Sequence, residues 1–463
     1  MEGRGQQLTS VDSGMTLSSP CGVSVSTKLF TIADRAKEIR NEPLKTLIHN
    51  VDKQWLEEAW RRTRKNAAAG IDKVSAVEYS TKLDENLDKL VQKIHGQYRA
   101  SPTKRVYIPK SDGYKRPLGL PTIEDKIAQR AVSMILEEVY EQEFLPMSFG
   151  FRPGCNAHQA INGLRSTIIH GKVRWVLDAD MKTFFDTIDH EWMIKFLSHR
   201  IGDRKILALI GKWLKAGSLE EGKLTKSSTG TPQGGVISPL LANVYLHYVL
   251  DLWVTKVVPK HLRGEIRSFR YADDVVFCFE FRNDAVRFLT ALKHRLGKFG
   301  LSLNEQKTKL VRFGCSAEKD RIQRGEKRST FKFLGFTFFN TKTQKGRYQA
   351  GCRTSSKSIN HSMNRVRDFC KQHRHQNVAW QARYLNAILR GHYNYFAITG
   401  NFRCIAKFYR HVTRMWKRYL GRRSQRAYLN EDKFQRILRS HPLLQPKVYH
   451  SIYKRRRWDD WLS

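Results

Sequence analysis

The sequence predicts an α+β protein in which short antiparallel strands alternate with amphipathic helices and a helical region follows. Two apolar, β-branched and aromatic runs, Ile266 to Tyr271 and Val275 to Phe281, flank a pair of aspartates and predict a hairpin. From about Ile359 to Leu420 apolar residues recur every three or four positions, which predicts consecutive helices. The chain is therefore expected to divide into a mixed region followed by a helical one.

The composition limits the class of function. The 463 residues leave room for two to four domains. Lys and Arg number 83 against 43 Asp and Glu, and the resulting net charge of +40 indicates a polyanionic partner. The chain has no run of about 18 apolar residues, so no membrane partner is predicted. The seven cysteines form no Cys-x-x-Cys pair, which favours a reducing compartment over a disulfide framework or a zinc cluster.

Residues 1–26 are rich in Ser, Thr and Gly and contain few large apolar residues. This composition predicts a disordered leader, and the absence of a charged start followed by an apolar core argues against a secretory signal.

Adjacent carboxylates at the tip of the predicted hairpin suggest a metal site. Neighbouring side chains of a strand point to opposite faces, and a turn lets Asp273 and Asp274 converge. Taken alone, the pair is more typical of a solvated turn than of a metal site. A predicted strand from Val173 to Met181, however, carries Asp178 and Asp180 on one face near its end. Three carboxylates are the minimum set for two Mg²⁺ ions that activate a hydroxyl and stabilise a leaving oxygen.

Two further segments suggest contacts with phosphate. Asp112-Gly113 predicts a hairpin turn that places Lys110 on one strand and Lys115 and Arg116 on the facing strand, where the cations could grip a phosphate chain. The alternative is an edge hairpin that its charges protect from aggregation. The glycine-rich loop 230–235 must bring backbone close to another group. Together with the carboxylates and the basic surface, these segments predict nucleotidyl transfer.

The last quarter of the chain has a composition of its own. Residues 351–463 contain 25 Lys and Arg but 5 Asp and Glu, a net charge of +20. A surplus this one-sided predicts a nucleic-acid-binding region. The aromatic residues interleaved with the charges are more typical of a helical core than of base-stacking platforms.

A series of motifs in register resembles the successive motifs of reverse transcriptases encoded by group II introns. The segments are Asn66 to Asp72, Arg116 to Pro121, Ser148 to Gly154, Asp178 to Asp180 with Phe184 to Asp186 and Ile188 to His190, Thr231 to Gly235 with Ile237 to Asn243, Tyr271 to Asp274, Leu303-Asn304 with Lys307-Thr308, Phe333 to Gly335, and Leu389 to Phe396. They cover about residues 30 to 455.

The resemblance implies a right-hand polymerase. Fingers and palm, the palm carrying an antiparallel sheet, would occupy residues 27–345, and an α-helical thumb, or maturase domain, residues 351–429. Residues 430–463, which include the basic run Lys454 to Arg457, would form a DNA-binding segment, the alternative being a basic disordered end. No paired cysteines follow Cys370, so we expect the form of the family without an endonuclease domain.

The resemblance also implies roles for individual residues. Asp180, Asp273 and Asp274 would be catalytic and bind the two Mg²⁺ ions, with Asp178 in a supporting role. Phe185 would exclude a ribose 2′-hydroxyl. The remaining nucleotide contacts would be Gln233 at the sugar and Lys110 and Arg116 at the triphosphate.

The implied function is an RNA-directed DNA polymerase that also binds its group II intron RNA, assisting splicing and mobility by target-primed reverse transcription. Its partners would be the intron RNA, an RNA template, a DNA primer or target DNA, and deoxynucleoside triphosphates. The implied location is the bacterial cytoplasm, with an organelle as the alternative. Two other functions stay open: a maturase that acts in splicing alone, and a reverse transcriptase used in phage defence. The intact set of Asp180, Asp273 and Asp274 favours the polymerase over the first.

Overall fold

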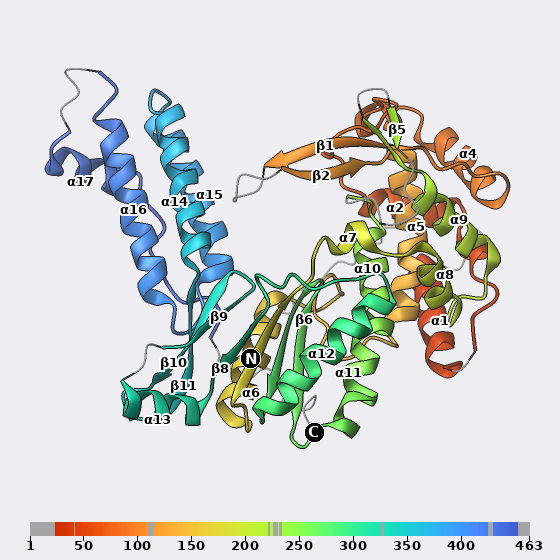
Figure 1. Ribbon diagram of the computed structural model, residues 1–463. Helices are drawn as coiled ribbons and strands as arrows, with labels where there is room; N and C mark the ends of the chain where they lie inside the picture. Colours follow the sequence, from red (N-terminus) through yellow and green to blue (C-terminus); the bar gives the residue numbers. More distant parts are fainter. Residues whose placement is uncertain are drawn as a thin grey trace, which may run out of the picture.

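The computed structural model describes residues 24–40, 42–109, 115–220, 223–225, 230, 234–325, 328–424 and 429–451. Three bodies follow one another in Figure 1: a helical part with a long hairpin, a central sheet covered by helices, and a helical bundle on a second sheet. The mixed composition and the antiparallel sheets confirm the predicted α+β class.

The first body combines helices with a four-stranded sheet of order β2-β1-β4-β5. Strands β1 and β2 form the predicted antiparallel hairpin, in which Lys115 lies opposite Pro109 and Arg116 opposite Ile108. Residues 110–114, which include Lys110 and the expected turn, lie outside the described chain. The elements are α1 (Val25–Glu38), η1 (Ile48–Asn50), α2 (Lys53–Arg62), α3 (Ala76–Ser80), α4 (Leu83–His95), β1 (Thr103–Pro109), β2 (Lys115–Leu120), α5 (Ile123–Tyr140), α8 (His190–Ser198), α9 (Arg204–Lys215), β4 (Ser218–Glu220) and β5 (Lys223–Thr225).

The second body is built on an antiparallel sheet of order β6-β7-β3-β8. Strands β6 and β7 form the hairpin predicted around the adjacent aspartates. The elements are α6 (Ala157–His170), β3 (Trp175–Asp180), α7 (Phe184–Thr187), α10 (Ser238–Leu246), the π-helical turn η2 (His247–Asp251), α11 (Leu252–Lys256), η3 (Val258–His261), β6 (Ile266–Tyr271), β7 (Asp274–Phe279), α12 (Arg282–Lys298), β8 (Lys309–Arg312) and α13 (Cys315–Arg324).

Alternation along the central strands divides the core in two. Leu177 of β3 and Phe277 of β7 belong to the large core that the helices of the first two bodies share. Val176 and Val276, one residue earlier on the same strands, belong to a second core with α6 and the following sheet. Because side chains alternate across a sheet, Asp178, Asp180 and Asp274 share the face of this second core.

The third body begins with a three-stranded sheet of order β11-β10-β9, and helices pack behind it. Strand β11, which includes residue 351, pairs with β10. The helical part therefore starts at residue 356 rather than 351. Phe434 and Leu443 pack in the core of the bundle, which joins residues 430–451 to the helices before them. The elements are β9 (Thr330–Phe333), β10 (Phe336–Lys342), β11 (Tyr348–Thr354), α14 (Ser356–Gln372), α15 (Val378–Phe396), α16 (Phe402–Leu420) and α17 (Glu431–Ser440).

Several predicted segments reach beyond the described residues. Of the expected leader, residues 1–23 lie outside them, while Val25 and Ser26 already belong to α1. The basic run Lys454 to Arg457 also lies outside. Within the described chain we find no helix with the length and apolarity needed to cross a membrane.

Candidate active site

The predicted carboxylates meet at one end of the central sheet. Asp180, the last residue of β3, lies directly opposite Asp274, the first residue of β7. Asp178 is two residues earlier on β3 and shares their face. Asp273 stands in the two-residue turn between Tyr271 and Asp274, which are themselves paired. The structure therefore brings together the three residues predicted as metal ligands and the supporting Asp178.

The carboxylates influence one another's ionisation. Burial, reinforced by the charges of Asp178, Asp273 and Asp180, raises the pKa of Asp274 to about 7. Burial and the charge of Asp180 raise the pKa of Asp178 to about 6, although Lys309 and Lys332 act in the opposite direction. Negative charge is thus concentrated at this end of the sheet, and the neighbouring cations neutralise only part of it.

The residues suit a divalent cation by their charge and chemistry. Carboxylate oxygens are the ligands that Mg²⁺ prefers, and a cation would relieve the repulsion that raises the pKa of Asp274. In the part of the chain that the structure describes, no three Asp, Glu, His or Cys side chains converge closely enough to form a complete ligand cage. The fit therefore rests on the concentration of charge and on the shared face of the sheet.

A neighbouring segment holds the end of β3 in place. The backbone N–H of Asn304 donates to the carbonyl of Asp180 at 2.7 Å, and Met181 forms a bridge with Leu303. Lys307, in the same segment, lies 3.4 Å from Asp180 between Nζ and Oδ2. Both side chains are well exposed, so the ion pair is weak and readily exchanged for a stronger cation. No role was predicted for Lys307. Its position in the Leu303-to-Thr308 motif was the one signal that could have pointed to the site.

The backbone of one residue, Leu334, joins Asp274 to the helical bundle. The backbone N–H of Leu334 donates to Asp274 Oδ2 at 3.3 Å, and its carbonyl accepts from the Tyr395 hydroxyl of α15 at 3.0 Å. Leu334 has a φ of 48°, a conformation that a non-glycine residue adopts only when its surroundings impose it. This contact could not be predicted from the sequence, because an aromatic residue in a helix predicts only a core position.

Of the predicted nucleotide contacts, the structure describes Phe185 in full. Its ring is partly exposed on α7, the short helix after Asp180, and packs edge-on against Phe184 at a centroid distance of 5.3 Å. Only the backbone of Arg116 is described, and it pairs with Ile108 in the β1–β2 hairpin. Lys110 and Gln233 lie outside the described residues.

The glycine-rich loop does approach other backbone closely, as predicted. Gly230 donates its N–H to the carbonyl of Ile188 at 2.7 Å, beside α7. At Gly234, which has a φ of 113°, a Cβ atom would stand 2.6 Å from the carbonyl oxygen of Gly119 in β2. The contacts of these two glycines thus place the ends of the loop beside α7, which carries Phe185, and beside the β1–β2 hairpin.

Comparisons with known proteins agree with this geometry. The family model described as reverse transcriptase (RNA-dependent DNA polymerase) matches residues 108–338, which include every carboxylate of the site. Protein YkfC of Escherichia coli is 38% identical over 251 residues, which cover 53% of this chain and 64% of that protein. The group II intron-encoded protein LtrA of Lactococcus lactis is 36% identical over 251 residues, covering 52% of this chain and 40% of that protein. An uncharacterised 91 kDa protein in a cob intron of Schizosaccharomyces pombe is 40% identical over 163 residues, 35% of this chain and 20% of that protein.

We expect Asp274 to make stability depend on pH and on divalent cations. A folded-state pKa of about 7 exceeds the usual carboxyl value, so the folded protein retains a proton that the unfolded chain loses, and stability should fall as pH rises from about 4 to 7. With a chelator, the melting temperature should decrease between pH 5.5 and 8, and Mg²⁺ should restore it at pH 8.

The Asp274→Asn variant should show a weaker dependence on both pH and Mg²⁺. Asp368→Asn, which changes an exposed carboxylate of α14, serves as the control and should behave as the wild type does. Identical pH profiles for the wild type and Asp274→Asn, measured by thermal unfolding, would contradict the assignment.

Proposed function

We infer that the chain belongs to the reverse transcriptases and maturases encoded by group II introns and that it is an RNA-directed DNA polymerase. The observation that carries the proposal is the set of Asp180, Asp273 and Asp274 at one end of an antiparallel sheet, inside the matched family region. The proposed reaction joins a deoxynucleotide to the 3′ end of a primer on an RNA template.

We assign the metal-binding role to Asp180, Asp273 and Asp274. Two Mg²⁺ ions bound there would supply Lewis-acid stabilisation for the attacking and leaving oxygens of nucleotidyl transfer. The protein's own contribution is to fix the carboxylates: β3 and β7 hold Asp180 and Asp274 opposite each other, and the turn presents Asp273. Asp178 adds negative charge from the same face.

The nucleotide would bind between the β1–β2 hairpin and α7. Lys110 and Arg116 are proposed to contact the triphosphate, and Gln233 the sugar. Phe185 would lie against the 2′ position of the nucleotide sugar. Its ring is partly exposed, and it follows Asp180 by five residues. The close approach of Gly234 to Gly119 supports this arrangement, because it brings the Gln233 loop to the hairpin that carries Arg116.

Helices α14 to α16 are proposed as a thumb that also binds intron RNA. Along α16, five exposed cations follow one another at intervals of three or four residues, and the helix contains no acidic residue. We call them the α16 basic stripe: Arg403, Lys407, Arg410, Arg414 and Arg418. The opposite face carries Ile405, Phe408, Val412 and Trp416, all fully buried. The burial fixes the helix, and the stripe is left free to neutralise phosphates.

On this basis the protein would assist splicing of its intron and drive mobility by target-primed reverse transcription, with residues 430–463 contributing to DNA binding. The proposed setting is the bacterial cytoplasm, in keeping with relatives from Escherichia coli and Lactococcus lactis. A maturase acting in splicing alone is the second candidate, favoured by the similarity to nuclear intron maturase 1, mitochondrial, of Arabidopsis thaliana.

Polymerisation should depend on Asp273. Asp273→Ala should reduce primer extension on an RNA template by at least about 100-fold, because it removes one of three metal ligands, while RNA affinity stays near that of the wild type. Glu191→Gln, which alters an exposed carboxylate of α8, is the control. Extension by Asp273→Ala above a few per cent of wild type would refute the polymerase assignment.

Sugar selection should depend on the ring of Phe185. Phe185→Ala should raise incorporation of ribonucleotides relative to deoxynucleotides roughly tenfold, since the steric conflict with the 2′-hydroxyl disappears. Phe185→Leu should give an intermediate ratio. Competition assays with matched nucleotide pairs measure the effect, and an unchanged ratio in both variants would place the discrimination elsewhere.

RNA binding should depend on salt and on the α16 basic stripe. We expect a log–log slope of at least about −4 for binding of structured intron RNA, and replacing all five stripe cations with Gln should make the slope shallower by roughly 3 or more. The control replaces five exposed cations on other elements with Gln: Arg204, Lys215, Lys256, Lys260 and Arg287.

Splicing assistance should fall with RNA affinity in the stripe variant but survive in Asp273→Ala, because splicing is chemistry of the RNA. An equal loss of salt dependence in the stripe and control variants would show that RNA does not bind at α16. Loss of splicing with Asp273→Ala would contradict the separation of the two activities.

A further inference from the structure

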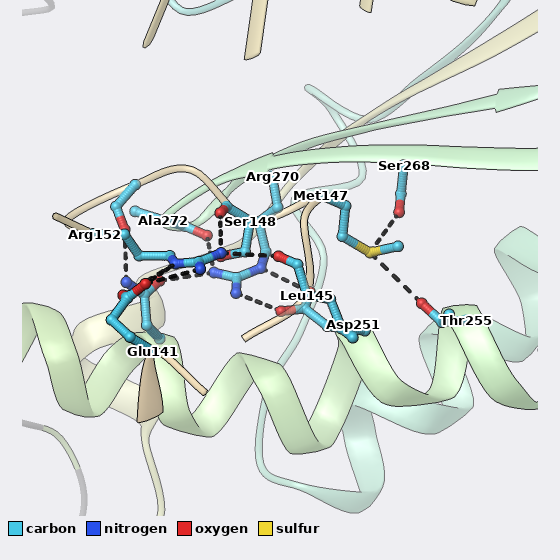
Figure 2. Close-up of polar contacts among 12 residues, drawn as sticks. Glu141, Leu145, Met147, Ser148, Arg152, Asp251, Thr255, Ser268, Arg270 and Ala272 are labelled. Atoms are coloured by element: carbon cyan, nitrogen blue, oxygen red, sulfur yellow. Dashed lines mark hydrogen bonds and ion pairs between the residues drawn. The ribbon is translucent and has the colours of Figure 1, made fainter. Parts of the chain in front are cut away.

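A buried arginine lies directly under the turn that carries Asp273. Arg270 belongs to β6, two residues before Ala272, and is 1% exposed. Figure 2 shows its guanidinium between Asp251 and the backbone of Ala272. Nε and Nη2 donate to the two carboxylate oxygens of Asp251 at 2.8 and 2.5 Å. Nη1 donates to Asn243 Oδ1 at 2.9 Å and to the carbonyl of Ala272 at 3.2 Å.

The contact with Ala272 matters because this residue shapes the turn. Ala272 and Asp273 form a two-residue loop, and Ala272 has a φ of 56°. Tight hairpins require a positive φ, which glycine or asparagine usually provides. An alanine in this conformation is strained and keeps it only where neighbouring groups hold it. The Arg270 guanidinium holds its carbonyl oxygen.

The same turn is confined from a second side. A Cβ atom on Gly150 would stand 2.4 Å from the backbone nitrogen of Ala272, so only glycine fits there. The carbonyl of Gly150 accepts from Asn243 Nδ2 at 2.6 Å, and the same Asn243 side chain accepts from Arg270. Asn243 thus ties the segment that presses on the turn to the arginine that supports it.

Backbone hydrogen bonds fix the segment before Gly150 to β6, and a second arginine fixes the segment's own shape. Arg270 N–H donates to the carbonyl of Met147, and its carbonyl accepts from Phe149 N–H, both at 2.9 Å. Arg152 donates to both oxygens of Glu141 and to the carbonyls of Leu145 and Ser148, as Figure 2 shows. The segment therefore cannot withdraw from Ala272 without breaking several bonds.

A π-helical turn brings the two partners of Arg270 to one side. Asn243 lies in α10 and Asp251 ends η2, eight residues later. In a continuous α-helix, residues eight apart point about 80° from each other. The wider turn of η2 takes up this difference, and π-helical turns occur often at functional sites. The irregular helix is therefore part of the same arrangement.

We propose that Arg270 is a positioning residue: with Asp251 and Asn243 it fixes the turn that presents Asp273 and Asp274. Stability alone is a poor explanation for the network, because a buried ion pair can usually be replaced by apolar residues without loss of stability. The hydrogen bond to Ala272 has no apolar substitute. The inference rests on the proposed function in so far as these carboxylates are taken to bind metal for polymerisation.

The test separates burial of charge from support of the turn. Arg270→Met leaves Asp251 buried without its partner and should be strongly destabilised. The double variant Arg270→Met/Asp251→Leu removes both charges and should recover most of the melting temperature. It still lacks the bond to Ala272, so kcat should stay at least about tenfold below wild type while KM for the deoxynucleotide changes by less than about threefold.

Mn²⁺ binding, followed by electron paramagnetic resonance, gives a readout that needs no polymerisation. The double variant should bind Mn²⁺ at least about tenfold more weakly than the wild type, because its carboxylates are no longer held in place. A loss of Mn²⁺ affinity would uphold the proposal even if the wild type did not extend primers. Failure of the polymerase assignment would instead appear as an inactive wild type.

A matched pair controls for the loss of a buried arginine. Arg200 is 3% exposed and lies 2.9 Å from Glu143, far along the chain from the hairpin. Arg200→Met/Glu143→Leu should leave kcat and Mn²⁺ affinity close to wild type. If the Arg270 double variant does not fold, Arg270→Lys replaces it; this change keeps the charge but loses the planar fork and should show the same two losses. Wild-type kcat and Mn²⁺ affinity in a folded variant, or equal losses in the control, would overturn the proposal.

Discussion

Repulsion among carboxylates is the constraint around which the central sheet is arranged. Asp178, Asp180 and Asp274 occupy one face at the end of two adjacent strands, with Asp273 in the turn beside them. Burial first, and then the charges of the neighbouring carboxylates, raise the pKa of Asp274 to about 7, so both the position and the company of this group disfavour its ionised form without a cation. Considered for stability alone, the folded state would be favoured by a greater distance between these carboxylates. Neighbouring segments must therefore hold each one in place, and most of the irregular features of the structure do so.

These supports come from separate parts of the chain, and those at Asp180 and Ala272 act on the backbone rather than on a carboxylate side chain. Asn304 holds the carbonyl of Asp180. Gly150 and Arg270 confine Ala272 from two sides. Backbone support leaves the carboxylate oxygens available for a ligand. Two contacts do reach a carboxylate oxygen: the N–H of Leu334 donates to Asp274, and Lys307 forms an exposed ion pair with Asp180 of the kind that a divalent ion displaces without much loss.

The sequence predicted the parts of the site that depend on local patterns. Alternation in β3 and a turn between two apolar runs were enough to bring Asp180, Asp273 and Asp274 together, because a strand has a fixed period of two. The support by Arg270 could not be predicted in this way. Asp251 reaches it only through a π-helical turn, and an interpretation based on a period of 3.6 residues places Asp251 on a different side from Asn243. Tyr395 was likewise indistinguishable from a core aromatic. The boundary at residue 351 also missed β11, whose pairing with β10 has no signal within its own seven residues.

The backbone contacts of Leu334 link the movement of one part of the structure to another. The N–H of Leu334 binds Asp274 and its carbonyl binds Tyr395, so two hydrogen bonds in series run from the catalytic sheet to helix α15. The two groups belong to successive peptide units that meet at the Leu334 Cα, so the backbone geometry of this one residue sets both contacts. Leu334 is held at a positive φ and has little freedom to absorb a displacement. A movement of the helical bundle at Tyr395 is therefore expected to move the backbone that contacts Asp274. A displacement of α15 that lengthens the bond from Tyr395 is transmitted to the Asp274 carboxylate through the backbone of one residue.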